Sequence, residues 1–209
     1  MKISKHEARD YIIAIAKNLF MEKGYLDTSF RDIAKAGDLT LGRIYVYFKK
    51  KEDLFIAVIN PILEQMESMN LKMGMQRDDE LIENLFNRES ALSSLKAQVN
   101  LMKKYRNELN LILFKSDGFY AFDFRKMIIE SYIHNMNYMM NLLKEKEMTK
   151  VELSESFGYS IGSLYISIFE IVAKGELNEI EIGQYLEQII SFIYHGNMGV
   201  FGKLEENEK

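Results

Sequence analysis

The amino-acid sequence predicts an all-α protein, with a small N-terminal domain of three helices and a larger helical C-terminal domain. The 209 residues include one proline and only twelve glycines, too few turn formers for a fold of many strands. Met, Leu, Ile, Glu and Lys, which favour helices, are abundant instead. With 47% hydrophobic and 28% charged residues, the composition is that of a globular chain.

A first amphipathic helix is expected over residues 5–23, because apolar side chains recur there at helical spacing. These side chains are Ala8, Ile12, Ala16, Leu19 and Phe20. Gly24 follows the last turn, where a left-handed residue commonly ends a helix.

Two short helices are expected next, joined by a tight turn. Ser29 and Asp32 have the spacing of a capping box, which predicts the start of the second helix. Gly37 and Asp38 are expected to form the turn, since both residue types tolerate positive φ. Thr40 is expected to cap the third helix. The side chains expected to face the core are Phe30, Ile33, Ala34, Ile44 and Phe48.

A fourth helix is expected to begin near Lys51, and Asn60-Pro61 is expected to interrupt it. Either the helix kinks at Pro61, or Asn60 caps a new segment with Pro61 at its first position. The polar residues 74–90 are expected to be a connection with room for a short helix. Further helices are expected over 91–106, 107–116, 119–147, 152–174 and 179–197, with Gly175 and Gly196 at the ends of the last two. Residues 119–147 are apolar on most sides, which predicts a central helix.

Composition excludes several kinds of site and leaves the charge unevenly distributed. The absence of cysteine excludes disulfides and thiolate metal sites, and the three histidines form no pair, so no metal or cofactor is expected. No run approaches eighteen apolar residues and the N-terminus has no apolar signal segment, so a cytoplasmic protein is expected. Residues 1–60 hold eleven Lys and Arg against eight Asp and Glu, a charge of +3, whereas residues 61–209 carry −7. A basic end on an acidic remainder favours contact with DNA at that end.

The segment from Ser29 to Lys51 has the layout of a helix-turn-helix, whose second helix enters the DNA major groove. On that helix, Arg43 is suited to bind guanine O6 and N7, and Leu41 to contact a thymine methyl. Thr40 is expected to contact a phosphate, and Gly42 to let the backbone approach the DNA closely.

Residues 5–55 resemble the DNA-binding domain of the TetR family of bacterial transcription regulators. The matching segments are FMEKGY at 20–25, TSFRDIAKAG at 28–37 and TLGRIYVYFKKKEDLF at 40–55. One departure is Asp38, which stands where the family usually has glycine. The later helical region is similar to the family's ligand-binding and dimerisation domain in length and style.

The resemblance implies further DNA contacts. Tyr45, Tyr47 and Lys51 match or neighbour family positions that bind phosphate, and Arg31 and Ser29 complete the expected set. Alternatives stay open, since Tyr45 could be a core aromatic and Arg31 could pair with surface acids. Lys49 and Lys50 are expected to contribute general electrostatic attraction.

The second domain is rich in Met, Phe and Tyr, side chains that suit an adaptable apolar site but also serve as ordinary core. The candidate effector-binding residues are Met102, Phe114, Phe119, Phe122, Met136, Met139, Met140, Tyr165 and Phe169. His134 is expected to be a buried, hydrogen-bonded histidine rather than a ligand contact.

The last two helices resemble the family's dimer interface. Gly158 and Gly162 lie four residues apart and would permit close helix approach, with packing inside the chain as the alternative. The candidate interface residues are Gly158, Gly162, Tyr185, Ile189 and Ile193.

Two features of the sequence bear on other classes of protein. Gly158 to Gly162 fit the G-x-S-x-G pattern of serine hydrolases, which requires a preceding strand, but the residues before it are helical in character. An architectural protein that binds DNA without sequence preference would carry strong positive charge, whereas this chain carries −4.

The sequence thus predicts a DNA-binding transcriptional regulator without enzymatic activity. The resemblance implies a repressor that binds a palindromic operator as a homodimer and is released by a small, largely apolar effector. Residues 1–50 would form the helix-turn-helix domain and residues 51–209 the effector-binding and dimerisation domain, with the helix from 51 linking them. The expected partners are double-stranded DNA, the effector and a second copy of the chain, with no membrane.

Overall fold

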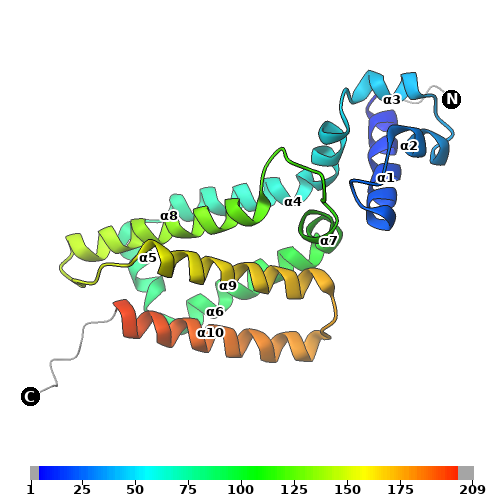
Figure 1. Ribbon diagram of the computed structural model, residues 1–209. Coiled ribbons are helices and arrows are strands. Elements are labelled where there is room, and N and C mark those ends of the chain that lie inside the picture. Colours follow the sequence, from blue (N-terminus) through cyan, green and yellow to red (C-terminus); the bar gives the residue numbers. More distant parts are fainter. Residues whose placement is uncertain (1–4, 202–209) are drawn as a thin grey trace, which may run out of the picture. The chain divides into compact units, whose positions relative to one another are not determined.

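The computed structural model describes residues 5–201, apart from the side chains of residues 70, 72–74 and 201, and every regular element in that range is an α-helix (Figure 1). The predicted all-α class is therefore confirmed. The helices are α1 (Lys5–Lys23), α2 (Phe30–Ala36), α3 (Leu41–Tyr47), α4 (Lys51–Gly74), α5 (Asp78–Leu85), α6 (Arg88–Lys104), α7 (Arg106–Phe114), α8 (Phe124–Glu145), α9 (Glu155–Lys174) and α10 (Glu179–Phe201).

The helices divide into two compact units. The N-terminal unit comprises residues up to 69 together with residues 105–124, and the C-terminal unit comprises residues 70–104 and those from 125 onward. The N-terminal unit is thus discontinuous in sequence. Helix α4 begins in the N-terminal unit and passes into the C-terminal unit after Met69.

The core of the N-terminal unit is apolar and includes an aromatic cluster. Helix α1 packs against both α2 and α7, and α2 packs against α3. The Phe55 ring lies 5.2 Å from that of Phe20, 5.0 Å from that of Tyr25 and 4.8 Å from that of Phe119, measured between centroids. Phe119 belongs to the distant segment 105–124, so that segment completes the core around the first helices.

Two polar contacts also hold the segment 105–124 in place. The Lys17 ammonium lies 2.5 Å from the carboxylate of Glu108, which is only 7% exposed. The Tyr25 N–H donates to the carbonyl of Lys115 at 2.8 Å. A buried carboxylate without a cation would be costly, so the ion pair ties α7 to α1.

The turn between α2 and α3 forms as its residues predict, with one difference. Asp38 is left-handed, with φ at 49°, whereas Gly37 has φ at −96° and needs no special backbone freedom. A Cβ at Gly37 would lie 2.4 Å from the terminal methyl of Ile15, so a larger residue there would force the Ile15 side chain to move. The predicted capping box is confirmed, because Ser29 and Asp32 exchange both hydrogen bonds.

Helix α4 runs through Pro61 without interruption. The alternative in which Asn60 caps a new segment is therefore wrong, since the Asn60 amide instead donates to Glu64 within the same helix, at 2.5 Å. Pro61 is exposed, which leaves room for its ring on the outer side of the helix.

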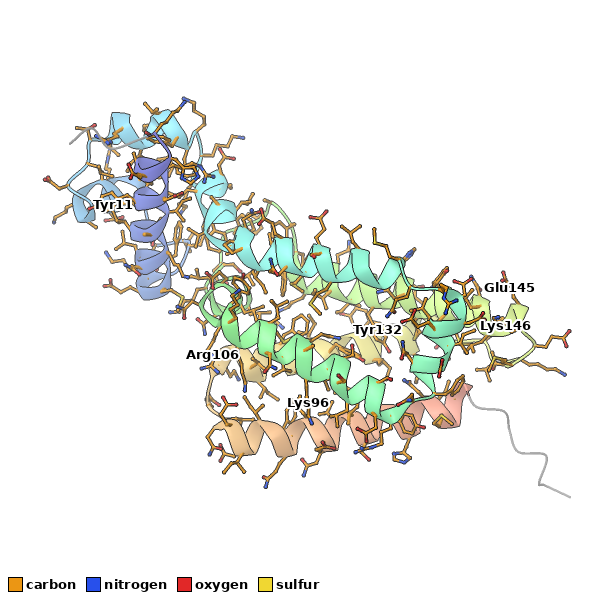
Figure 2. All side chains as sticks on the ribbon, turned by 180° about the vertical axis from the view of Figure 1, so that it is seen from behind. Tyr11, Lys96, Arg106, Tyr132, Glu145 and Lys146 are labelled. Atoms are coloured by element: carbon orange, nitrogen blue, oxygen red, sulfur yellow. The ribbon has the colours of Figure 1, made fainter. Side chains whose placement is uncertain are left out.

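In the C-terminal unit, α6 packs against both α9 and α10, and α5 packs against α6. Some predicted boundaries were wrong. The helix expected over 119–147 begins only at Phe124, α6 begins at Arg88 inside the expected connection, and α10 continues past Gly196. Tyr132 lies on α8 (Figure 2), beside a buried cluster made of Ile82, Met136, Met140, Leu142 and Leu143.

Helix α9 is long and apolar enough to cross a membrane when length and composition alone are considered. Buried core helices of soluble proteins pass the same test, and α9 buries Ile166, Ile168 and Phe169 within its own unit. Its apolar character is therefore accounted for by packing.

Candidate nucleic-acid interface

Helix α3 buries one side and exposes the other. Ile44 is fully buried, and Thr40 caps the helix by accepting a hydrogen bond from the N–H of Arg43 at 3.2 Å. Arg43 and Gly42 are exposed, and a Cβ at Gly42 would meet no atom within 4 Å. The outer side of α3 therefore offers a guanidinium and an open stretch of backbone, as an element that enters a groove requires.

Val46 also lies on this exposed side, with 62% of its surface accessible, and sequence analysis did not single it out. An exposed β-branched side chain on such a helix can pack on a thymine methyl. Leu41 and Tyr47, which were predicted to contact DNA, are half-buried. A signal was available, because Val46 lies three residues after Arg43 and therefore shares its face.

Tyr45 is 46% exposed, so it is not the packed core aromatic that the sequence allowed as an alternative. Its ring stands edge-on to that of Phe30, with centroids 5.2 Å apart. The Lys49 ammonium donates to the Tyr45 carbonyl at 2.8 Å, which satisfies an orphan acceptor at the C-terminal end of α3. Tyr45 is thus held at its base while its hydroxyl end remains accessible.

Tyr45 borders an open hollow that gathers residues from three elements. The hollow is lined by Leu26, Asp27, Thr28, Ser29, Phe30, Tyr45, Lys49, Lys50 and Lys51. Three lysines against one aspartate give it a positive character that suits a phosphate. Arg31 lies nearby on α2, exposed and without a hydrogen bond or ion pair to any residue that the structure describes.

Two groups near the hollow, the Asp32 carboxyl and the Tyr25 phenol, have pKa values shifted from their usual ranges. The Ser29 hydroxyl and N–H donate to Asp32 and hold the pKa of its carboxyl below the usual range. Burial raises the pKa of Tyr25 to about 12, and the neighbouring Glu52 carboxylate adds to the shift by charge and by accepting a hydrogen bond.

Lys51 is unlike the two lysines before it. Its ammonium donates to the carbonyls of Tyr25 and Leu26, at 2.7 and 3.2 Å, and lies 4.2 Å from the centroid of the Tyr25 ring. Partial burial lowers the pKa of Lys51, although Glu52 and Asp27 oppose this shift. The ammonium is therefore engaged inside the protein.

The comparisons with known proteins agree with this geometry. The family described as "Bacterial regulatory proteins, tetR family" matches residues 12–58, which span α2, α3 and most of α1. The transcriptional regulator QacR of Staphylococcus aureus is 27% identical over 172 residues, covering 81% of this chain and 71% of QacR. The chain carries a TetR-family DNA-binding domain. It is a DNA-binding transcriptional regulator and not an enzyme.

Solved structures show the TetR fold over the whole chain. A protein of Syntrophomonas wolfei assigned to the TetR family of transcriptional regulators has a TM-score of 0.61 and 21% identity, covering 98% of this chain and 100% of its own. NalD of Pseudomonas aeruginosa, described as the secondary repressor of the MexAB-OprM multidrug efflux pump, has a TM-score of 0.60 and 18% identity, covering 96% and 100%.

The candidate effector residues divide between the two units. The rings of Phe119 and Phe122 stand edge-on in the N-terminal unit, with centroids 5.4 Å apart, and Phe114 lies in the same unit with 37% exposure. In the C-terminal unit are Met102, Met136, Met139, Met140, Tyr165 and Phe169. There the Tyr165 ring lies 4.9 Å from that of Tyr132, while His134 is exposed, so its predicted burial is wrong.

The glycines expected at a dimer contact pack inside the chain. A Cβ at Gly158 would lie 2.8 Å from a methyl of Met136, and one at Gly162 would lie 3.2 Å from the Cα of Ile129. This is the alternative that the sequence left open, and it corrects the assignment of these two glycines. Tyr185 and Ile189 are half-buried and Ile193 is buried.

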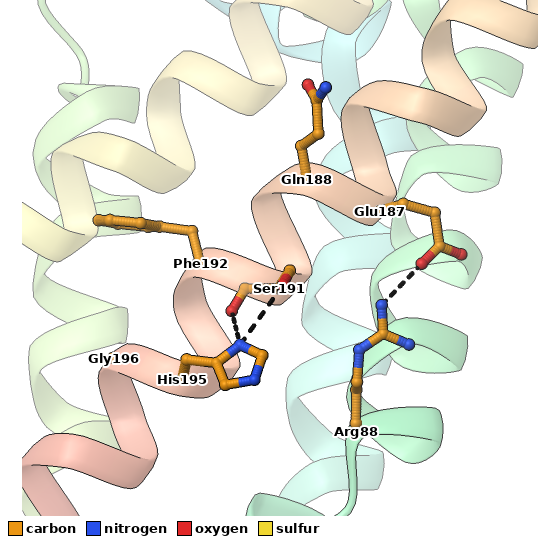
Figure 3. A pocket seen from close by; sticks show the side chains of 7 residues that line it. All are labelled: Arg88, Glu187, Gln188, Ser191, Phe192, His195 and Gly196. Atoms are coloured by element: carbon orange, nitrogen blue, oxygen red, sulfur yellow. Dashed lines mark hydrogen bonds and ion pairs between the residues drawn. The ribbon is translucent and has the colours of Figure 1, made fainter.

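The other side of α10 is accessible, and it borders a second hollow (Figure 3). Phe192 is 67% exposed there, and Arg88 pairs with Glu187 at 2.9 Å. His195 is also exposed and lies 2.7 Å from the carbonyl of Ser191. None of the candidate effector residues lines this hollow or the one beside α3.

The G-x-S-x-G match has no catalytic geometry. Ser160 lies inside α9, and its hydroxyl donates to the carbonyl of Ser156 one turn earlier, at 2.9 Å. A nucleophile elbow requires a sharp turn between a strand and a helix. Within the described residues, no group of three or more His, Cys, Asp and Glu side chains could hold a metal ion.

Proposed function

We propose that this chain is a homodimeric repressor that binds a palindromic operator through α3 and leaves it when a small, largely apolar effector binds. The exposed side of α3, with Arg43 accessible and Ile44 anchoring the helix, carries the DNA part of the proposal. Two copies of α3 would enter successive major grooves, with half-site centres about 34 Å apart or somewhat more. Its proposed place of action is the cytoplasm.

The base contacts belong to Arg43, with Leu41 and Val46 against thymine methyl groups. The contacts to the DNA sugar-phosphate backbone belong to Thr40, Tyr45, Lys49 and Lys50, while Gly42 lets the edge of the DNA approach. Ser29, Arg31 and Tyr47 complete the proposed surface. Contacts to phosphate would position α3, and contacts to bases would select the operator.

The dimer contact is proposed on the accessible side of α10. A Cβ at Gly196 or Gly199 would meet nothing within 4 Å, and Phe192 is largely exposed nearby. Small residues beside an exposed aromatic suit the close approach of a second helix. Phe192→Asp is expected to shift the protein from dimer to monomer in sedimentation equilibrium, whereas Tyr159→Asp, on exposed α9 surface, is the control.

The effector is proposed to bind among the Met and Tyr side chains of the C-terminal unit. Met139, Tyr132 and the buried Met136 and Met140 lie in one apolar cluster, and methionine adapts readily to apolar ligands. NalD is described as a repressor, which supports the proposal that this chain represses transcription rather than activating it. An effector must prefer the conformation that does not bind DNA, by about 5.5 kcal/mol to move the equilibrium from 1:99 to 99:1.

The deciding experiment is selection from a pool of random duplexes by the purified protein, followed by sequencing. Enrichment of a palindrome with half-sites about one helical turn apart, or a multiple of it, would support the dimeric repressor. Enrichment of a single half-site would contradict the dimer. No enrichment at low salt would contradict operator binding by the free protein.

A further inference from the structure

Three consecutive lysines follow α3, and their ammonium groups have different surroundings. Lys50 is exposed, and its ammonium makes no hydrogen bond or ion pair with any residue in the described range. Lys49 is also exposed and makes one bond, to the Tyr45 carbonyl. Lys51 is partly buried and makes two bonds to main-chain carbonyls. Equal charges in the sequence are thus unequally available to DNA.

The Lys51 ammonium has little capacity left for a phosphate. An ammonium has three N–H donors. Two of them point to the carbonyls of Tyr25 and Leu26, and the cation also lies against the face of the Tyr25 ring. A phosphate contact would require Lys51 to weaken these bonds, of which the one to the Tyr25 carbonyl is partly shielded from water.

The same bonds connect elements that shape the DNA-facing surface. Lys51 is the first residue of α4, and its two carbonyl partners lie in the connection between α1 and α2. That connection leads within three residues to Ser29, which caps α2. Helix α2 in turn packs against α3. Lys51 therefore holds the path of the chain that sets where α2 begins.

Tyr25 strengthens this junction. Its side chain is only 3% exposed, and its ring contacts those of Phe20, Phe55 and Phe119. A carbonyl on so firmly packed a residue is a fixed anchor for the Lys51 ammonium. The position of α4 relative to the α1–α2 connection is thereby defined at one point.

We infer that Lys51 is a positioning residue that fixes the α1–α2 connection against α4, and that Lys50 and Lys49 supply the positive charge for the DNA phosphate at this corner. The inference rests on the proposed function. It differs from the role that the family resemblance implies for Lys51, which is a phosphate contact.

The test compares Lys51→Met with the matched variants Lys50→Met and Lys49→Met. Each removes one charge and keeps an unbranched side chain. Operator affinity is measured from low to physiological salt, at a temperature where circular dichroism shows each variant fully folded. Lys50→Met is expected to flatten the plot of log affinity against log salt by about 1.8, because the dimer loses one phosphate contact, with a slope of about 0.9, in each subunit. Lys51→Met is expected to weaken binding several-fold with the wild-type slope.

Two results with Lys51→Met would overturn the inference. A slope reduced by about 1.8 for the dimer would make Lys51 a phosphate contact. If folded Lys51→Met bound the operator with wild-type affinity, Lys51 would contribute only to stability. Failure of the proposed function is recognised by a different result, in which the wild-type protein enriches no duplex. In that case the inference about Lys51 fails as well.

A second measurement uses the wild-type protein and does not depend on the variant folding. Lysines are acetylated with acetic anhydride, with and without operator duplex, and the extent is mapped by mass spectrometry. Lys51 is expected to react slowly in both samples, whereas Lys50 reacts readily and becomes protected by DNA. A Lys51 that reacts readily in free protein and is protected only by DNA would overturn the inference.

Discussion

The backbone and the side chain of Arg43 have different roles. Its N–H completes the cap of α3 on Thr40, and its guanidinium is exposed. We expect Arg43→Ala to cost about 1–3 kcal/mol of operator binding and to relax the preference at one base position. The measurement is competition binding against operators changed one base pair at a time.

The Arg43 result has a clear contrary outcome. Because the substitution keeps a backbone N–H, the cap should remain and the thermal midpoint should change little. An equal loss of affinity on every duplex would make Arg43 a backbone contact. Arg77→Ala is a matched control that removes the same charge from an exposed residue at the start of α5, outside the proposed DNA-binding surface.

Tyr25 makes the stability of the protein sensitive to alkaline pH. Its pKa is about 12 in the folded chain and about 10 when unfolded, so between these values the folded state keeps a proton that the unfolded state loses. The stabilisation is complete below pH 10 and is lost as pH rises toward 12. Over that interval the loss is about 2 kcal/mol.

Tyr25→Phe should therefore flatten the fall in unfolding free energy above pH 10, as measured by urea unfolding. Tyr120→Phe is the control, since that side chain is 90% exposed. An unchanged alkaline fall in the Tyr25 variant would mean that other groups cause it, among them Tyr132 and Tyr165, whose pKa values burial also raises.

The contact between α9 and α8 depends on two glycines that are not equivalent. The nearest atom to a Cβ at Gly158 is the terminal methyl of Met136, which can move, whereas at Gly162 it is the Cα of Ile129. Alanine gains about 1 kcal/mol of helix propensity over glycine at either site. We therefore expect Gly158→Ala to be near neutral and Gly162→Ala to be destabilising.

Thermal and urea unfolding of the two alanine variants measure which of them is the less stable. If Gly162→Ala were as stable as Gly158→Ala, α9 would have freedom to move away from α8. Because both sites face α8, neither variant should alter the state of assembly.

The sequence predicted local features of the helices better than their ends. The first helix, the capping box and the cap at Thr40 were predicted correctly, because each depends on residues within four positions of one another. The start of α8 was predicted five residues too early. Phe119 is apolar because it packs in the aromatic cluster of the N-terminal unit, and not because it belongs to the buried face of a helix. Gly196 was taken for a helix end, although α10 continues through it.

The candidate site was predictable to a similar extent. The helix that presents Arg43 follows from a short motif, whereas the engagement of Lys51 depends on carbonyls 25 and 26 residues earlier in the chain. No spacing rule reveals such a bond. The internal role of Gly158 and Gly162 likewise required the position of α8.

The N-terminal unit as a whole draws on two distant stretches of chain. A fragment that ends at Met69 keeps α1 to α3 but lacks Glu108 and Phe119. We expect this fragment to melt below the full chain and to bind a dye specific for exposed apolar surface, since Tyr25 and Phe55 lose the Phe119 ring.

The ion pair between Lys17 and Glu108 provides a control for the comparison of the full chain with the fragment. Lys17→Met should destabilise the full chain by about 1–3 kcal/mol, because it leaves the Glu108 carboxylate buried without its cation. The same change should cost little in the fragment, where Glu108 is absent. A fragment as stable as the full chain would instead support a DNA-binding domain that folds alone, with a boundary near residue 50.

The discontinuity of the N-terminal unit has a consequence for the newly made protein. On the ribosome, α1 to α3 emerge well before the residues that complete their core. The 55 residues from 70 to 124 take roughly 3–11 s to synthesise at about 5–20 residues per second. During that interval the nascent chain carries an unfinished DNA-binding surface with exposed phenylalanines, which a chaperone can hold. A growing polypeptide would thus not occupy its operator before translation has passed residue 124.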